Sequence, residues 1–115
     1  MNEILLITRP ITRRQLKELA AEGFGDLVKA VADVKRRVLA IGGELHADAE
    51  AFLLEQGSLQ RDLWGINFYP DLEMPDMLEF DSLINIRPSQ GNRSRSVDDP
   101  AIRQEILEIV ARLVE

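Results

Sequence analysis

Alternating large apolar residues in the middle of this chain constrain its fold more than any other feature of the sequence. Between residues 63 and 69, every second position carries a large apolar side chain: Trp64, Ile66 and Phe68. Because successive side chains of a strand point to opposite faces of a sheet, these three share one face, which must be the core. Asn67 and Tyr69 then lie on the opposite, polar face of the predicted strand.

A second strand is predicted over residues 79–87, after an acidic loop bounded by prolines. Its apolar face carries Phe80, Ile84 and Ile86, and its polar face carries Asp81, Asn85 and Arg87. A sheet face with this many polar side chains does not suit a covering helix. We therefore expect it to face solvent, to bind a ligand, or to form a wet interface between copies of the chain.

The remaining segments are predicted from capping and turn signals. A short apolar strand is expected over residues 4–8, and a helix over residues 47–56. Thr12 and Gln15 form a capping-box pair that opens another helix, which ends at Gly23. Asp99 caps the last helix, with Pro100 at its first position.

Residues 27–41 allow two interpretations. Apolar side chains from Leu27 to Ile41 recur at helical spacing. Four valines and a stretch of strict alternation favour extended chain instead. We predict a hairpin with strands near residues 27–34 and 36–41. A helix stays the alternative, because Lys35-Arg36 is a poor pair for a tight turn.

Together these elements predict an α+β fold, with a mostly antiparallel sheet and about three helices packed on one face. The 115 residues are enough for one core, so a single domain over residues 1–115 is expected. The chain has no cysteine and one histidine. This excludes disulfides, thiolate metal sites and a zinc site built from several histidines of one chain.

The charge distribution limits the partners. A net charge of −6 argues against general affinity for nucleic acid or for an anionic membrane. Glu3 stands where a signal peptide needs a basic region, and the apolar run after it is too short to cross a membrane. We therefore expect a soluble, cytoplasmic protein with no membrane partner.

Three stretches of the sequence form a familiar combination. They are residues 28–33 (VKAVAD), residues 42–50 (GGELHADAE), and residues 62–67 (DLWGIN) continuing into residues 84–95 (INIRPSQGNRSR). In this pattern the chain resembles, over nearly its whole length, a family of small prokaryotic proteins catalogued as a domain of unknown function. The resemblance implies a single domain and supports the hairpin, and it implies no particular activity.

Glu44, His46 and Asp48 form the first candidate site. In an extended chain their side chains point the same way. The three side chains could then hold a divalent metal, or the two carboxylates could orient His46 as a general base. The competing interpretation is a helix start, in which Asp48 is the cap and His46 packs locally. One histidine with two acids is a weak metal signal, so we predict neither a metal nor a cofactor and keep a catalytic role for these residues as a hypothesis.

The loop over residues 87–95 forms the second candidate site. It has no acidic residue, and its arginines and amides suit a planar or tetrahedral anion such as phosphate. The predicted ligand-binding residues are Arg87, Gln90, Asn92, Arg93 and Arg95, with Asn67, Tyr69 and Asn85 from the polar sheet face. The competing interpretation is an exposed loop whose arginines pair with acids of residues 71–81 in the same or another subunit.

Two hypotheses about function follow. The first is a non-catalytic binding or interaction domain that self-associates, most simply as a dimer. The alternative is an enzyme or binding protein that acts on an anionic, phosphate-bearing small molecule through residues 87–95 and His46. If helix 47–56 connects two parallel strands, His46 and Arg87 lie at opposite ends of the sheet. Only a folded-back loop over residues 88–98 could then join the two sites.

Overall fold

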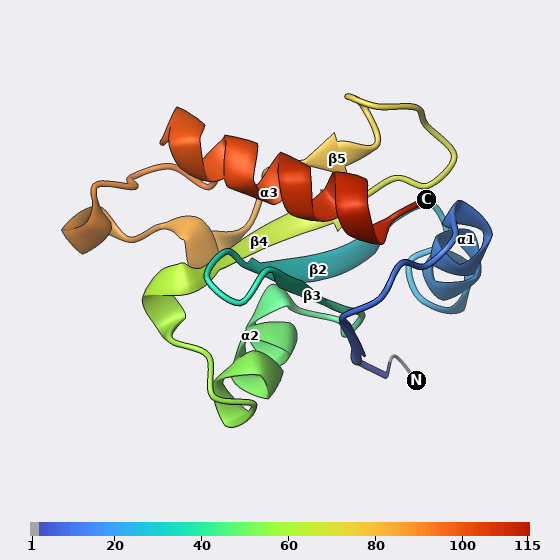
Figure 1. Cartoon of the computed structure of the whole chain (residues 1–115), viewed down its shortest axis with the longest axis horizontal. Coiled ribbons are helices and arrows are strands. Elements are labelled where there is room, and N and C mark those ends of the chain that lie inside the picture. Colours follow the sequence, from blue (N-terminus) through green and yellow to red (C-terminus); the bar gives the residue numbers. More distant parts are fainter. Residues whose placement is uncertain (1–2) are drawn as a thin grey trace.

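A five-stranded antiparallel sheet organises the chain (Figure 1). The computed structural model describes residues 3–115; residues 1 and 2 of the expected domain lie outside that part. The strands are β1 (Leu5–Ile7), β2 (Val28–Asp33), β3 (Val38–Ile41), β4 (Leu63–Phe68) and β5 (Leu78–Glu79). They pair in the order β1-β3-β2-β4-β5, so β2 is central and both β3 and β4 run antiparallel to it.

Three α-helices accompany the sheet, and capping residues explain where they begin. They are α1 (Arg13–Glu22), α2 (His46–Glu55) and α3 (Pro100–Leu113). The capping box of Thr12 and Gln15 opens α1, and the Asp99 carboxylate accepts a hydrogen bond from the Ala101 N–H at the start of α3. Within residues 3–115, none of the helices has the length and apolar character needed to cross a membrane.

Each face of the sheet carries its own apolar cluster. On the face that we call the α3 side, α1 and α3 cover Trp64, Ile66 and Phe68, together with the alternate residues of β2 and β3. On the α2 side, α2 covers a smaller cluster of Val31, Val38, Ala40 and Leu63. Figure 1 shows α3 and α2 on opposite sides of the sheet. The α+β class with an antiparallel sheet is confirmed; the expectation that all helices share one face is wrong for α2.

The predicted hairpin over residues 27–41 is confirmed, with Ala32 paired to Leu39 and Asp33 to Val38. The turn of this hairpin contains Lys35-Arg36, a poor pair for a tight turn, and is stabilised by the buried carboxylate of Asp33. The Oδ1 atom of Asp33 accepts hydrogen bonds from the N–H groups of Lys35 and Arg36, at 3.0 and 2.9 Å. Asp33 therefore supplies the turn stabilisation that Lys35-Arg36 lacks.

The predicted strand over residues 79–87 is wrong beyond its first residue. Strand β5 ends at Glu79, and the chain then leaves the sheet through a 3₁₀ turn, η2 (Leu83–Asn85). Side chains that were expected to share one face are consequently separated: Phe80 packs on the α3 side, Ile84 packs on the α2 side, and Ile86 is exposed. The alternation of apolar residues in this segment is therefore not a strand signal.

Replacing Trp64 by alanine tests the assignment of β4 to the core. Trp64 is 2% exposed within the α3-side cluster, so Trp64→Ala should lower the free energy of unfolding by about 3–5 kcal/mol. Urea unfolding measures this loss. The exposed Leu83→Ala is the control and should change stability by less than about 0.5 kcal/mol. A loss below about 1 kcal/mol for Trp64→Ala would show that the faces of β4 are inverted.

Candidate functional site

A cavity of about 380 Å³ opens on the α2 side, beyond the N-terminal end of α2. Helix α2 covers the paired positions Val31 and Ala40 but leaves the next row of the sheet open. The helix begins only at His46, which follows the turn at Gly42 and Gly43. Both glycines have left-handed backbone angles, φ 119° and 87°, which favour residues without a Cβ.

Three paired residues form the floor of this cavity. Lys29 on β2 is paired with Asn67 on β4, and Asn67 is paired with Glu79 on β5. Paired residues of neighbouring strands point to the same face, so the three side chains form one row with a cation at one end and an anion at the other. We call Lys29, Asn67 and Glu79 the polar row.

Hydrogen bonds fix one end of the polar row. The Nδ2 atom of Asn67 donates to Glu79 Oε1 at 2.9 Å and to the Asp81 carbonyl at 3.1 Å. The Tyr69 hydroxyl donates to the same Glu79 oxygen at 3.2 Å. Burial, with the Glu79 charge nearby, raises the pKa of Tyr69, so its hydroxyl stays protonated as a donor. Asn67 is 7% exposed, and its Oδ1 atom has no hydrogen-bond partner among the described residues.

His46 forms the wall of the cavity at the start of α2. Its Nε2 lies 2.8 Å from the Ile66 carbonyl oxygen, which can only accept, so Nε2 carries the proton and Nδ1 is the basic atom of the neutral ring. Burial is the main cause that lowers the pKa of His46, and the nearby Lys29 charge adds to the effect. The imidazole is therefore held neutral at neutral pH.

Gly65 allows His46 to lie this close to the sheet. A Cβ atom at residue 65 would lie 2.5 Å from the Ser82 Cβ and 3.2 Å from the His46 Cδ2. Both side chains therefore pack directly on the bare backbone of β4. No larger residue fits between the two walls without displacing one of them.

The remaining wall comes from the segment that follows β5. Ser82, Leu83 and Ile84 line the cavity opposite α2, and Arg95 reaches it from the folded-back loop. The Arg95 Nε donates to the Asp81 carboxylate at 2.6 Å, so these two charges are already paired. At the other end of the row, the Lys29 ammonium lies 5.2 Å from the centre of the Phe24 ring.

Four of the residues predicted from the sequence meet in this cavity. They are His46, Asn67, Tyr69 and Arg95. Glu44 and Asp48 do not line it: both are exposed, and the Asp48 carboxylate accepts a hydrogen bond from the Leu45 N–H of its own helix. Asp48 therefore stabilises the start of α2 from its first turn and does not converge with His46. Among residues 3–115, no cluster of three or more His, Asp or Glu side chains is arranged to hold a metal ion.

Arg87 lies at the opposite end of the sheet, as the crossover argument predicts. Its guanidinium donates to the carbonyl oxygens of Gln60 and Leu63 and stacks on the Trp64 ring, 4.2 Å from its centre. Burial lowers the pKa of Arg87. The predicted partner Gln90 binds the carbonyl of Arg61. These donors hold the loop onto the start of β4 and onto residues 60–62 just before it, and they do not line the cavity.

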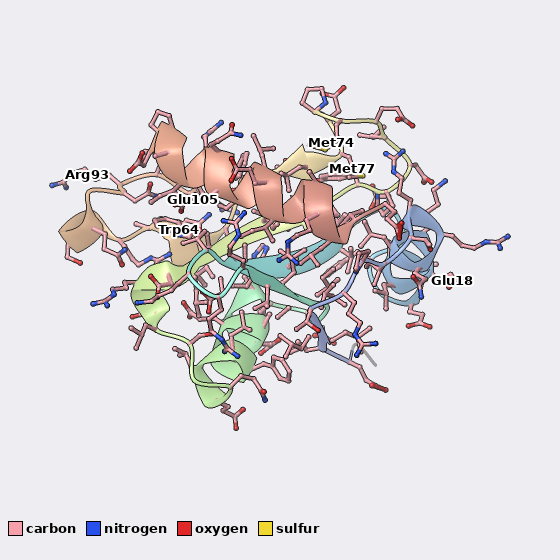
Figure 2. The ribbon with its side chains drawn as sticks, viewed as in Figure 1. Glu18, Trp64, Met74, Met77, Arg93 and Glu105 are labelled. Atoms are coloured by element: carbon pink, nitrogen blue, oxygen red, sulfur yellow. The ribbon has the colours of Figure 1, made fainter. Side chains whose placement is uncertain are left out.

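The C-terminal part of the loop over residues 87–95 is hydrogen-bonded to the carboxylate of Asp98, which follows the loop. The Asp98 side chain accepts hydrogen bonds from the Ser94 hydroxyl at 2.6 Å and from the Arg93 N–H at 3.2 Å. The Ser94 hydrogen bond is the main cause that lowers the pKa of Asp98. Figure 2 shows the Arg93 side chain extending away from the body of the protein at the tip of this loop. The loop as folded thus gathers Arg95 alone into the cavity.

The side chains of Asn85 and Asn92 are hydrogen-bonded to backbone groups of the protein. The Asn85 amide pairs with the Gly65 backbone: its Oδ1 accepts from the N–H at 2.8 Å and its Nδ2 donates to the C=O at 3.0 Å. Asn92 Nδ2 donates to the carbonyls of Asn85 and Ser96, each at 2.7 Å. Both residues are buried, so their predicted ligand-binding role stays a prediction that this geometry does not favour.

Comparison with known proteins assigns a family. A family model described as a protein of unknown function, DUF5674, matches residues 5–113. The chain belongs to the DUF5674 family. No curated protein and no solved structure matches it. The resemblance inferred from the sequence is therefore confirmed as membership of a family of unknown function, while the particular residue pattern on which it rested stays a prediction.

Lys29 and Glu79 are the cavity residues that sequence reasoning missed. Neither residue stands in a sequence pattern that is typical of a binding site. Only the pairing of β2, β4 and β5 places them in one row. The available signal was the parity of Lys29 in the hairpin, which sets it on the same face as Asn67 once the register is known.

The buried neutral His46 predicts a pH-dependent stability. In the unfolded chain His46 takes up a proton near pH 6.5, whereas the folded state resists protonation because the ring is buried. Stability is therefore complete above about pH 6.5 and falls below it, by at most about 1.4 kcal/mol per pH unit. Urea unfolding of the wild type and of His46→Gln at several pH values measures this. Parallel profiles between about pH 7 and pH 5 contradict it.

Removing the Asn85 amide tests its pairing with β4. Asn85→Ala leaves the Gly65 N–H and C=O without their partner in a buried position, so we expect a loss of about 1–3 kcal/mol or more. Gln90→Ala, which removes two exposed hydrogen bonds of the same loop, is the control and should cost less than about 1 kcal/mol. Equal small losses in urea unfolding would show that the amide pairing is dispensable.

Proposed function

We propose that this protein is a non-catalytic domain that binds a small polar molecule in the cavity between α2, β4 and η2. A volume of about 380 Å³ lies in the range of small-molecule sites. The lining joins apolar side chains with a few polar groups held in place by hydrogen bonds, which is the composition of such sites.

The observation that carries this proposal is the polar row. Elsewhere on the α2 side the sheet is built from small or apolar residues such as Val31 and Ala40, apart from Asp33, whose carboxylate is fully hydrogen-bonded to Ser58 and to the hairpin turn. In the polar row, a buried amide keeps an unpartnered oxygen on Asn67 and two charged side chains stand without an ion pair among the described residues. An unpartnered buried polar group costs about 1–3 kcal/mol. A ligand that uses these groups supplies the reason for retaining them.

The alternative of a phosphate-bearing substrate has weaker support. It needs several arginines around His46, and only Arg95 of the loop lines the cavity. The carboxylates of Glu79 and Asp81 stand beside it and repel a ligand that carries two negative charges. We therefore favour binding of a molecule without a large net negative charge, and we propose no reaction for His46.

Self-association is a second candidate, favoured by the rim of the cavity. Leu45 and Leu83 stand on its two walls and are 59% and 67% exposed. A second copy that covers these side chains would bury apolar surface and close the mouth of the cavity. Light scattering over a wide concentration range tests this, with Leu83→Ser as the variant. A mass that stays monomeric throughout contradicts self-association and leaves ligand binding unaffected.

Amide NMR spectra with a library of small polar molecules test ligand binding. We expect some members to shift the resonances of Asn67, Tyr69 and His46 in a saturable manner. Lys29→Gln should weaken this binding, because it removes the charge at one end of the polar row. Lys35→Gln is the matched control: it makes the same substitution in the exposed turn at the far end of the same hairpin and should leave binding unchanged.

Two outcomes would overturn the proposal. The first is a library in which no member shifts the cavity resonances. The second is binding that responds equally to Lys29→Gln and Lys35→Gln, since a general charge effect on the acidic protein would then explain it.

A further inference from the structure

Resting on the proposed binding function, we infer that the ligand is a free α-amino acid with an aliphatic side chain. Its ammonium group binds at Glu79 and its carboxylate at Lys29, the two ends of the polar row. The inference rests on which charges of the cavity are free, how they are spaced, and what lines the space above them.

Two charges of the cavity have no ion-pair partner among the described residues: Lys29, whose ammonium lies 5.2 Å from the centre of the Phe24 ring, and Glu79. The Arg95 guanidinium and the Asp81 carboxylate neutralise each other at 2.6 Å. Within residues 3–115, Lys29 and Glu79 form no ion pair. The Oε1 atom of Glu79 accepts two hydrogen bonds, from Asn67 and Tyr69, which orients the carboxylate and leaves its Oε2 atom without a hydrogen-bond partner.

The opposite signs of these two charges, on either side of Asn67, select a ligand that carries both signs. Lys29 and Glu79 are separated by the whole of β4, so their Cα atoms stand about 9–10 Å apart, twice the distance between neighbouring strands. Asn67 between them is neutral. A simple anion is attracted by Lys29 and repelled by Glu79, and a simple cation the reverse, whereas a zwitterion is attracted at both ends.

The walls of the cavity select the rest of the molecule. Leu27, Leu45, Leu83 and Ile84 surround the row with branched aliphatic side chains. Such a lining favours an apolar group on the ligand, which leaves water when it binds. An aliphatic amino acid presents its zwitterionic head to the row and its side chain to these four residues.

Isothermal titration calorimetry with three probes tests the charge requirement. The probes are L-leucine, isoamylamine, which lacks the carboxylate, and isocaproate, which lacks the amine. We expect leucine to bind and each analogue to bind at least about tenfold more weakly, because each loses one charge-assisted contact. An analogue that binds as well as leucine overturns the zwitterion requirement.

Two variants assign the ends of the ligand. Glu79→Gln keeps an oxygen acceptor for Asn67 and Tyr69 but removes the charge, so it should weaken leucine about tenfold or more and leave isocaproate unaffected or tighter. Lys29→Gln should weaken leucine and isocaproate and spare isoamylamine. Lys35→Gln should leave all three unchanged. Variants that affect the two analogues in the opposite sense overturn the assigned orientation.

The amide NMR resonances of the cavity residues Asn67, Tyr69 and His46 distinguish failure of this inference from failure of the proposed function. If leucine leaves the cavity resonances unmoved while another library member shifts them in a Lys29-dependent manner, the amino-acid inference is wrong and the binding function stands. If neither leucine nor any library member shifts them, both are wrong.

Discussion

The hydrogen bonds between the Asn85 side chain and the Gly65 backbone are the interaction on which the arrangement of this protein depends. They satisfy the N–H and C=O of β4 where a fifth strand would otherwise have to continue. The chain is therefore free to leave the sheet after Glu79 and fold over the α2 side. The same Asn85 amide donates to the Arg95 carbonyl, which holds the returning loop against the cavity wall. One buried amide thus sets both the end of the sheet and the position of the site.

The parts of the fold that follow from local chemistry were predictable from the sequence. The Thr12–Gln15 capping box, the Asp99 cap and the alternation in β4 each depend on residues close together in the chain. The segment after Glu79 was not predictable, because an alternating pattern does not show that a side-chain amide replaces the backbone as the partner of β4. The position of α2 was missed for a related reason: β3 is apolar on both faces, and either face could have received the helix.

In the candidate site, too, the individual residues were predictable from local sequence, whereas their arrangement depends on tertiary structure. His46, Asn67, Tyr69 and Arg95 were predicted individually, from residue type and strand parity, but as members of two separate sites. Their union depends on the folded-back loop, and the contribution of Glu79 depends on the register of three strands. The remaining arginines misled sequence reasoning, because an acid-free loop suggests an anion site only if its donors are free. Here backbone carbonyls occupy the Arg87 guanidinium, and the Arg93 guanidinium extends away from the protein at the tip of the loop (Figure 2). The Asp98 carboxylate accepts from the Arg93 backbone N–H and shapes the loop.

The opening above the polar row is a property of the backbone, which makes it robust to change in the side chains around it. A Cβ at Gly42 would lie 2.1 Å from the Glu3 carbonyl oxygen, so the turn between β3 and α2 requires glycine there. That turn starts α2 beside Ile66, where the His46 ring binds the Ile66 carbonyl, and leaves the next row of the sheet uncovered. The lining can therefore vary while the cavity persists. Variation in Lys29, Glu79 and the aliphatic walls would alter which molecule is bound, whereas variation in Gly42, Gly65 or Asn85 would disturb the site itself.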